Sequence, residues 1–176
     1  MPKPQLPDTF RKIAVWNTAF LGDAVLTLPL IRALKAAFPE AQIHFFFLLG
    51  YYDLFRAHPD LTAVHEVDKH GVLRKLAALR RFGTECPHMD SEWWISAPRS
   101  PHSAFVARAS RAPMRIGYDS PLYNLLAYTH TVPRCFNELE EIERILQLLK
   151  PLGVEPPIRP WPVPALPDEA RKAAAA

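Results

Sequence analysis

Cysteine is scarce in this chain: the two cysteines, Cys86 and Cys135, lie far apart, and neither belongs to a Cys-x-x-Cys pair. A reduced cytoplasmic setting is the simplest interpretation of such a sequence. The seven histidines are scattered singly. Cys86-Pro87-His88 comes nearest to the spacing of metal ligands, but no second ligand pair accompanies it. The sequence therefore predicts no metal site.

A long apolar segment is also missing. The most apolar run, residues 45–49 with Ile43 before it, is far shorter than the ~20 residues that a membrane-spanning helix needs. Residues 1–8 contain three prolines and no apolar stretch, which is unlike a secretory signal. We therefore expect a soluble, cytoplasmic protein, for which peripheral contact with a membrane stays open.

Several chemical motifs are absent as well. The sequence has no Gly-x-Gly-x-x-Gly and no Gly-Lys-Ser/Thr, so its first crevice is not built for a pyrophosphate. No serine lies in a Gly-x-Ser-x-Gly turn. The net charge is only +3, from 21 basic and 18 acidic residues, which is too small an excess to indicate nucleic-acid binding.

What is present is a globular composition, with 49% hydrophobic and 22% charged residues in 176 positions. Apolar runs typical of strands alternate with stretches that have helical spacing. This alternation predicts a doubly wound, Rossmann-like α/β domain with a mostly parallel sheet. We expect strands at 13–16, 42–48, 61–67, 92–96, 114–118 and 130–132, and helices at 25–38, 51–57, 72–82, 104–109 and 138–149. Pro29 requires the first helix either to kink there or to begin nearby.

The chain changes character after Gly153, where six prolines fall between positions 156 and 167. We predict a Rossmann-like domain over residues 1–153, an extended interdomain linker over 154–167, and the start of a truncated second domain at 168–176. The alternative interpretation of the last two segments is a flexible C-terminal tail.

The loop 17–23 leaves the first predicted strand at its carboxyl end, where open parallel sheets bind ligands. Gly22 allows a tight turn or a close approach to a ligand. Asp23 stands in the first turn of the next helix, where its carboxylate is suited to accept a proton from a sugar hydroxyl. The simpler alternative is that Asp23 only caps free amides of that helix.

Other residues have two interpretations each. Arg99 and Ser100 follow the fourth strand and are candidates to bind an anion, although Arg99 could equally be a solvated loop residue and Ser103 could cap the next helix. The basic stretch 69–81 is either a solvated helix face or a surface that attracts anionic lipopolysaccharide or lipid headgroups. Trp93 and Trp94 are expected in the core, because neighbours on a central strand point to opposite buried faces.

Four stretches together resemble the ADP-heptose:lipopolysaccharide heptosyltransferases, glycosyltransferase family 9. Residues 18–35, TAFLGDAVLTLPLIRALK, with Phe38-Pro39 after them, look like the opening of these enzymes. Residues 98–104 are similar to their Pro-x-Arg-Ser-x-x-Ser-Ala region, and RIGYD at 115–119 is similar to their Arg-Ile-Gly-Phe/Tyr-Asp strand. YTHTVP at 128–133, followed by EIER at 141–144, resembles the segment before their linker.

The resemblance implies a GT-B architecture, of which residues 12–153 match the N-terminal, acceptor-binding half. It implies an inverting transfer of heptose, or a similar sugar, from ADP-heptose or another nucleotide sugar to the lipopolysaccharide core at the inner face of the inner membrane. Asp23 would be the general base, Thr18 and Gly22 would shape its loop, and Arg99, Ser100 and Arg115 would contact the acceptor. No cofactor or metal is implied, and this half alone would be inactive because the donor site lies in the other half.

Two positions depart from the family's pattern. Members often have Ser-Leu-Arg-Ser where residues 100–103 of this chain are Ser-Pro-His-Ser, so that His102 replaces an arginine. Many have His-Glu-Val-Glu-Arg where residues 140–144 are Glu-Glu-Ile-Glu-Arg, so that Glu140 replaces a histidine. Both changes remove a potential cationic contact to an anionic acceptor. Two other functions stay open: a stand-alone, non-catalytic module that binds a glycolipid or a partner protein, and a flavodoxin-like domain that binds a nucleotide.

Overall fold

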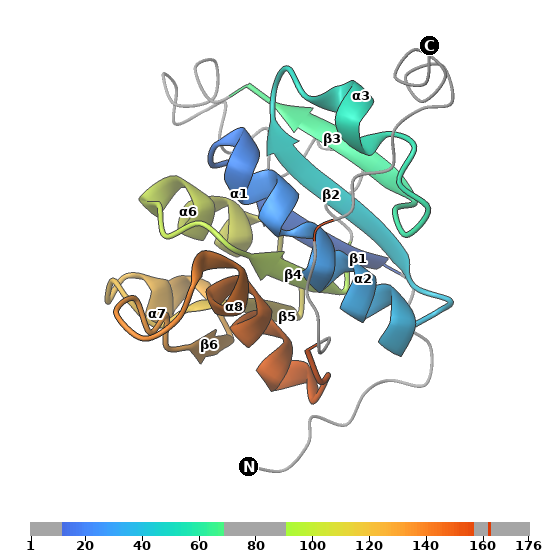
Figure 1. Cartoon of the computed structure of the whole chain (residues 1–176). Coiled ribbons are helices and arrows are strands. Elements are labelled where there is room, and N and C mark those ends of the chain that lie inside the picture. Colours follow the sequence, from blue (N-terminus) through green and yellow to red (C-terminus); the bar gives the residue numbers. More distant parts are fainter. Residues whose placement is uncertain (1–11, 69–90, 157–161, 163–176) are drawn as a thin grey trace.

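The computed structural model describes residues 12–68, 91–156 and 162, in which strands alternate with helices (Figure 1). The elements in chain order are β1 (Lys12–Asn17), α1 (Leu21–Leu26), α2 (Leu28–Ala37), β2 (Gln42–Leu48), α3 (Tyr52–Phe55), β3 (Ala63–Val67), β4 (Trp93–Ser96), α6 (Pro101–Ala109), β5 (Met114–Tyr118), α7 (Asn124–Ala127), β6 (His130–Val132), α8 (Glu141–Leu146) and the 3₁₀ helix η1 (Gln147–Leu152).

The six strands form one parallel sheet in the order β3-β2-β1-β4-β5-β6. The chain enters at the centre, builds outward to β3, and then returns to the other side of β1 to add β4, β5 and β6. This arrangement confirms the predicted doubly wound, Rossmann-like α/β fold. Ligands of such sheets bind where the direction of winding reverses, which here is the carboxyl end of β1 and β4.

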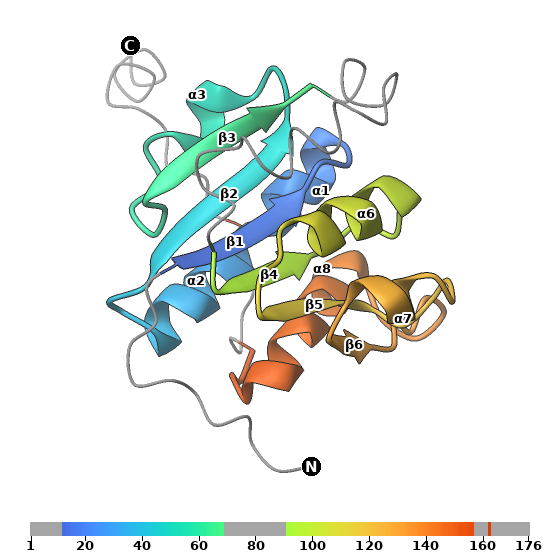
Figure 2. The same cartoon turned by 180° about the vertical axis from the view of Figure 1, so that it is seen from behind.

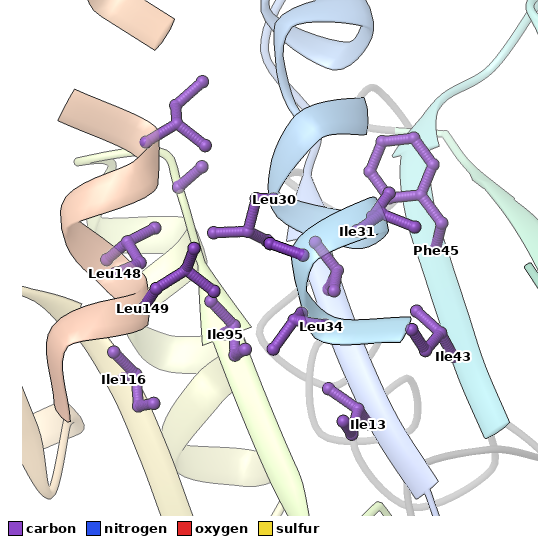
Figure 3. Close-up of a cluster of buried hydrophobic side chains, with 14 of the residues drawn as sticks. Ile13, Leu30, Ile31, Leu34, Ile43, Phe45, Ile95, Ile116, Leu148 and Leu149 are labelled. Atoms are coloured by element: carbon purple, nitrogen blue, oxygen red, sulfur yellow. The ribbon is translucent and has the colours of Figure 1, made fainter. Parts of the chain in front are cut away.

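Helices cover both faces of the sheet, as the two opposite views show (Figures 1 and 2). On one face α1, α2, α8 and η1 pack over Ile13 and Val15 of β1, and Figure 3 shows part of this cluster. On the other face α6 and α7 pack over Ala14 and Trp16. Alternate residues of one strand therefore enter two different cores, which explains why β1 reads as a continuous apolar run.

Aromatic side chains fill the core beneath α6. Trp16 of β1, Phe46 of β2 and Trp94 of β4 form a triangle of rings, with centroids 5.9, 5.5 and 5.5 Å apart. Trp93, on the other face, meets Phe38 edge-on at 5.2 Å. The prediction that both tryptophans belong to the core is confirmed, since Trp93 is 3% exposed and Trp94 is fully buried.

The first predicted helix is two helices, and Thr27 is the junction between them. It is the C-cap of α1 and the N-cap of α2. Pro29 lies in the first turn of α2, where its missing N–H removes no helical hydrogen bond. Of the two alternatives for Pro29, the helix therefore begins next to it.

The helix expected over 138–149 begins later and ends as a 3₁₀ turn, which Gly153 closes in the left-handed region at φ 66°. The helix expected over 51–57 is shorter, and α7 was not expected at all. The described part of the chain contains no helix that is both long and apolar enough to cross a membrane.

Several predicted features lie outside the described residues: the helix expected over 72–82, the basic stretch 69–81 and Cys86. The same holds for the second-domain segment 168–176 and for almost all of the proline-rich linker. The domain boundaries at 153 and 167 therefore stay predictions.

Candidate functional site at the carboxyl edge of the sheet

The parallel sheet brings two predicted site segments to one edge. Asn17 ends β1 and leads into the loop that carries Asp23, while Ser96 ends β4 and leads into the loop that carries Arg99. The two strands are neighbours, and the Ala97 N–H donates to the Trp16 carbonyl at 3.0 Å, so the β4 loop is bonded directly to the end of β1.

Asp23 lies at the third position of α1 with its side chain half-buried. Its Oδ2 accepts a hydrogen bond of 3.1 Å from the Phe20 N–H, which caps the helix. The reciprocal half of a capping box is missing, because the Phe20 side chain has no acceptor. The second carboxylate oxygen has no hydrogen bond within the described residues. Asp23 thus has a fixed orientation and one oxygen available to a hydroxyl group.

A buried polar group holds the backbone of this loop in place. The Asn17 amide is 2% exposed and donates to the Asp23 carbonyl at 3.0 Å and to Thr27 Oγ1 at 2.8 Å. Thr27 Oγ1 also donates to the Asp23 carbonyl at 2.8 Å, and the Ala19 N–H donates to Asn17 Oδ1 at 3.2 Å. The position of Asp23 is therefore set from β1 on one side and from the start of α2 on the other.

Gly22 and Thr18 differ in their exposure to solvent: Gly22 is open to solvent, whereas Thr18 is buried. A Cβ atom placed on Gly22 would meet nothing within 4 Å, and Gly22 lies within α1 rather than at a turn. Of the two alternatives for Gly22, the tight turn is not observed, and the open surface beside Asp23 leaves room for a ligand to approach. Thr18 is fully buried, and its Oγ1 has no hydrogen-bond partner among the described residues. Phe20, in contrast, is 81% exposed at the rim.

Arg99 is attached to the loop that follows β5. Its Nε donates to the Ser120 carbonyl at 3.2 Å, and the Tyr123 hydroxyl donates to the Arg99 carbonyl at 2.8 Å. The remaining contact, from one terminal nitrogen to Ser120 Oγ, is weak at 3.5 Å. The guanidinium is held by one good hydrogen bond and keeps further donors, so it is able to bind an anion at the same edge as Asp23.

Ser100 is the N-cap of α6. Its Oγ accepts from the Ser103 N–H at 3.1 Å, and the two hydroxyls share a further bond of 2.8 Å. Ser103 is buried and accepts from the Trp16 indole N–H at 3.1 Å. The alternative in which Ser103 caps the helix is therefore wrong: Ser100 is the cap, and Ser103 is a hydrogen-bond partner of Trp16 in the core.

Arg115 lies at the other end of the sheet, away from Asp23. It is the second residue of β5, and its guanidinium donates to the carbonyls of Ala112 at 2.6 Å and Ala127 at 2.7 Å. Burial, together with the nearby Arg108, lowers the pKa of Arg115 below its usual value. This position supports a structural role and does not favour the acceptor contact predicted for Arg115.

The structure adds one charged group that the sequence did not reveal. Glu141 at the start of α8 accepts from Arg134 at 2.9 Å and from Arg144 at 2.8 Å, and Arg144 lies 4.7 Å from the centre of the Phe136 ring. Arg134 lies two residues after the end of β6, and its place after a strand end was the signal that could have found it. Glu141 thereby joins the segment after β6 to α8.

The two residues that depart from the family's pattern are His102, which is nearly buried, and Glu140, which is a helix cap. His102 is 9% exposed and packs against Trp16, with ring centroids 5.9 Å apart. Glu140 is the N-cap of α8, and its N–H donates to Glu143 at 2.9 Å. Each residue therefore has a role in its own helix. Among the described residues, no three His, Cys, Asp or Glu side chains gather closely enough to hold a metal ion.

Several solved structures that are similar to this chain are described as glycosyltransferases or heptosyltransferases. The chain is similar to the glycosyl transferase family 9 protein of Veillonella parvula DSM 2008, with a TM-score of 0.81 and 19% identity over 94% of this chain and 48% of that chain. It is also similar to E. coli heptosyltransferase WaaC with ADP, with a TM-score of 0.70 and 20% identity over 85% of this chain and 49% of that one. For E. coli ADP-heptose lps heptosyltransferase II the TM-score is 0.69 and the identity 17%, over 94% of this chain and 49% of that one.

This chain therefore has the Rossmann-like fold that these GT-B glycosyltransferases have over about half of their length. It spans about half the length of each of them. No protein-family model matches the sequence, and neither does any curated protein sequence.

Proposed function

We propose that this chain is the acceptor-binding half of an inverting glycosyltransferase that moves heptose, or a similar sugar, from a nucleotide sugar to a lipopolysaccharide core. The observation that carries the proposal is the Asp23 carboxylate, which stands at the carboxyl end of the central strand with one oxygen held by Phe20 and the other available. The shared fold with heptosyltransferases supports this choice of reaction, and one such neighbour is described with ADP-2-deoxy-2-fluoro heptose.

In the proposed reaction, the free oxygen of Asp23 takes the proton of the acceptor hydroxyl. The hydroxyl oxygen attacks the anomeric carbon of the donor sugar as the bond from that carbon to the diphosphate breaks, and the nucleoside diphosphate leaves from the opposite face. The configuration at the anomeric carbon is thereby inverted. Arg99 binds an anionic group of the acceptor, and the open surface at Gly22 admits the sugar next to Asp23. The nucleotide sugar is bound mainly by a second domain, so these residues alone do not complete the site.

The test is Asp23→Asn in a full-length protein that includes the second domain. Asparagine keeps an acceptor for the Phe20 N–H but cannot take a proton, so the fold should survive while transfer falls by about 10²–10⁴-fold. Acceptor binding should change little. Asp53→Asn is the matched control, because Asp53 is 86% exposed and its one ion pair among the described residues is with Arg56. Transfer at near wild-type rate in Asp23→Asn would overturn the catalytic role of Asp23.

A second candidate is a non-catalytic module that binds a glycolipid or a partner protein. It is favoured by the cap that Asp23 forms, which gives this residue a structural role without any chemistry. Under this alternative, Asp23→Ala would lower the free energy of unfolding by about 1 kcal/mol, as loss of a cap does, and leave ligand binding intact. The two candidates differ in whether transfer in the full-length protein depends on the carboxylate.

A further inference from the structure

Helix α7 has its polarity inverted. Its buried residues are Asn124 and Ala127, which are 1% and 5% exposed, whereas Leu125 and Leu126 are 53% and 82% exposed. Leu122, just before the helix, is 80% exposed. A helix at the surface of a soluble domain normally turns its apolar residues toward the core. Three neighbouring exposed leucines therefore indicate a surface that something else covers.

Hydrogen bonds fix this orientation. The Asn124 amide donates to the carbonyls of Tyr118 at 3.0 Å and Ser120 at 3.1 Å, and the Tyr128 N–H donates to the Asn124 carbonyl at 2.9 Å. Turning the leucines inward would bury them only by exposing Asn124 and breaking these bonds. The outward leucines are thus a stable feature of the folded domain.

Helix α6 continues the same surface. Figure 2 shows α6 and α7 side by side on one face of the sheet. Arg115 joins their ends, since its guanidinium donates to Ala112 beyond α6 and to Ala127 of α7. The solvent side of α6 and of the turn after it presents Phe105, which is 37% exposed, with Arg108 and Arg111. We call this combined area the α6–α7 surface: Phe105, Arg108, Arg111, Leu122, Leu125 and Leu126.

The charge of this region is one-sided. Residues 93–137 contain five arginines and a single acidic residue, Asp119, a net charge of +4 in a chain whose total is +3. Arg108 and Arg111 form no ion pair with any residue in the part of the chain that the structure describes. The segment that exposes the leucines is therefore basic, as is the stretch 69–81.

We propose that the α6–α7 surface binds the face of an anionic lipid bilayer. Leucine and phenylalanine side chains enter the boundary between headgroups and acyl chains, while the arginines contact lipid phosphates. The α6–α7 surface has arginines and no carboxylate among its six residues. A uniformly negative lipid surface complements such a surface better than a protein surface of mixed charge does. This inference goes beyond the proposed transfer reaction, and its test requires no transferase activity.

The experiment is sedimentation of the 176-residue chain with vesicles of phosphatidylcholine alone or with about 30% phosphatidylglycerol. We expect binding to the anionic vesicles that weakens as salt is added, and little binding to phosphatidylcholine. Leu122→Ser with Leu126→Ser should lower the partition coefficient at least about tenfold. Arg108→Gln with Arg111→Asn should remove the preference for phosphatidylglycerol; asparagine suits position 111, where φ is 57°.

The matched control is Leu49→Ser with Lys150→Gln, which removes one exposed leucine and one exposed cation elsewhere. It should bind like the wild type, and circular dichroism should show all variants folded. The proposal is overturned if the wild type fails to bind anionic vesicles, or if the surface variants bind as well as the control. It is also overturned if light scattering shows a dimer that the leucine substitutions dissociate, because a second copy would then be the occupant.

Discussion

Asp23 and its neighbour Gly22 differ in what they contribute to the fold. The Asp23 carboxylate caps α1, whereas Gly22 fills no space and has no positive φ that would require glycine. A glycine within a helix lowers stability relative to alanine because it loses more backbone entropy on folding. Its presence next to Asp23 is therefore better explained by what approaches from outside than by the needs of the chain.

Gly22→Ala should raise the free energy of unfolding by about 0.5–1 kcal/mol, measured by urea denaturation of this chain. In a full-length protein the same substitution should raise KM for the acceptor while kcat changes less, because the added methyl group occupies space proposed for the sugar. An unchanged KM would place the acceptor away from Gly22. A loss of stability would contradict the open space around its Cα.

The sequence was sufficient to place Asp23 and Arg99 at one edge, because residues just after parallel strands must gather there. It was insufficient for the serines, since Ser100 and Ser103 are both plausible caps and only the position of Trp16 shows which one is buried. Arg115 lies early in its strand rather than after it, and the same rule would have placed it at the other end of the sheet.

At the scale of elements, α6 depends on Ser100 for its start. Ser100→Ala should lower the free energy of unfolding by about 1 kcal/mol through loss of the N-cap, and Ser100→Thr should restore most of it. Urea denaturation measures both values. Ser120→Ala is a suitable control, because Ser120 is exposed and binds Arg99 mainly through its backbone carbonyl. An unaltered stability in Ser100→Ala would show that the cap contributes nothing.

Strands were predicted within about two residues, because short apolar runs between polar turns leave little choice of position. Helices were less predictable. The helix α7 escaped notice because periodicity locates a helix by its buried apolar stripe, and α7 buries Asn124 instead. The α1–α2 break was recognised as a problem from Pro29, but its resolution at Thr27 depends on the hydrogen bond that Thr27 receives from Asn17.

At the scale of the whole molecule, buried tyrosines make stability depend on alkaline pH. Burial raises the pKa of Tyr128 to about 12, and it raises the pKa of Tyr118 as well. The ring of Tyr128 lies against Gly117, where a Cβ atom would come within 2.5 Å of it. In the unfolded chain a tyrosine titrates near pH 10. The folded state therefore holds the proton more tightly, and stability is complete below pH 10.

As the pH rises from about 10 toward 12, the free energy of unfolding should fall by about 1.4 kcal/mol per pH unit for each such tyrosine. Tyr128→Phe should remove the contribution of one tyrosine to this pH dependence of the free energy of unfolding, as measured by urea denaturation at a series of pH values. Tyr52→Phe is the control, since Tyr52 is 49% exposed. The same slope in Tyr128→Phe and in the wild type would contradict the contribution of Tyr128.

The strand order also governs how this chain emerges from a ribosome. β1 pairs with β2, and β2 with β3, so these three strands are able to associate as soon as residue 67 has left the ribosomal exit tunnel. The other side of β1 has to wait for β4 at residue 93, and until then this buried, apolar strand presents an unpaired edge. Such edges template the pairing of foreign strands. The nascent protein is thus most exposed to aggregation, and most in need of a chaperone, while residues 68–92 are leaving the ribosome.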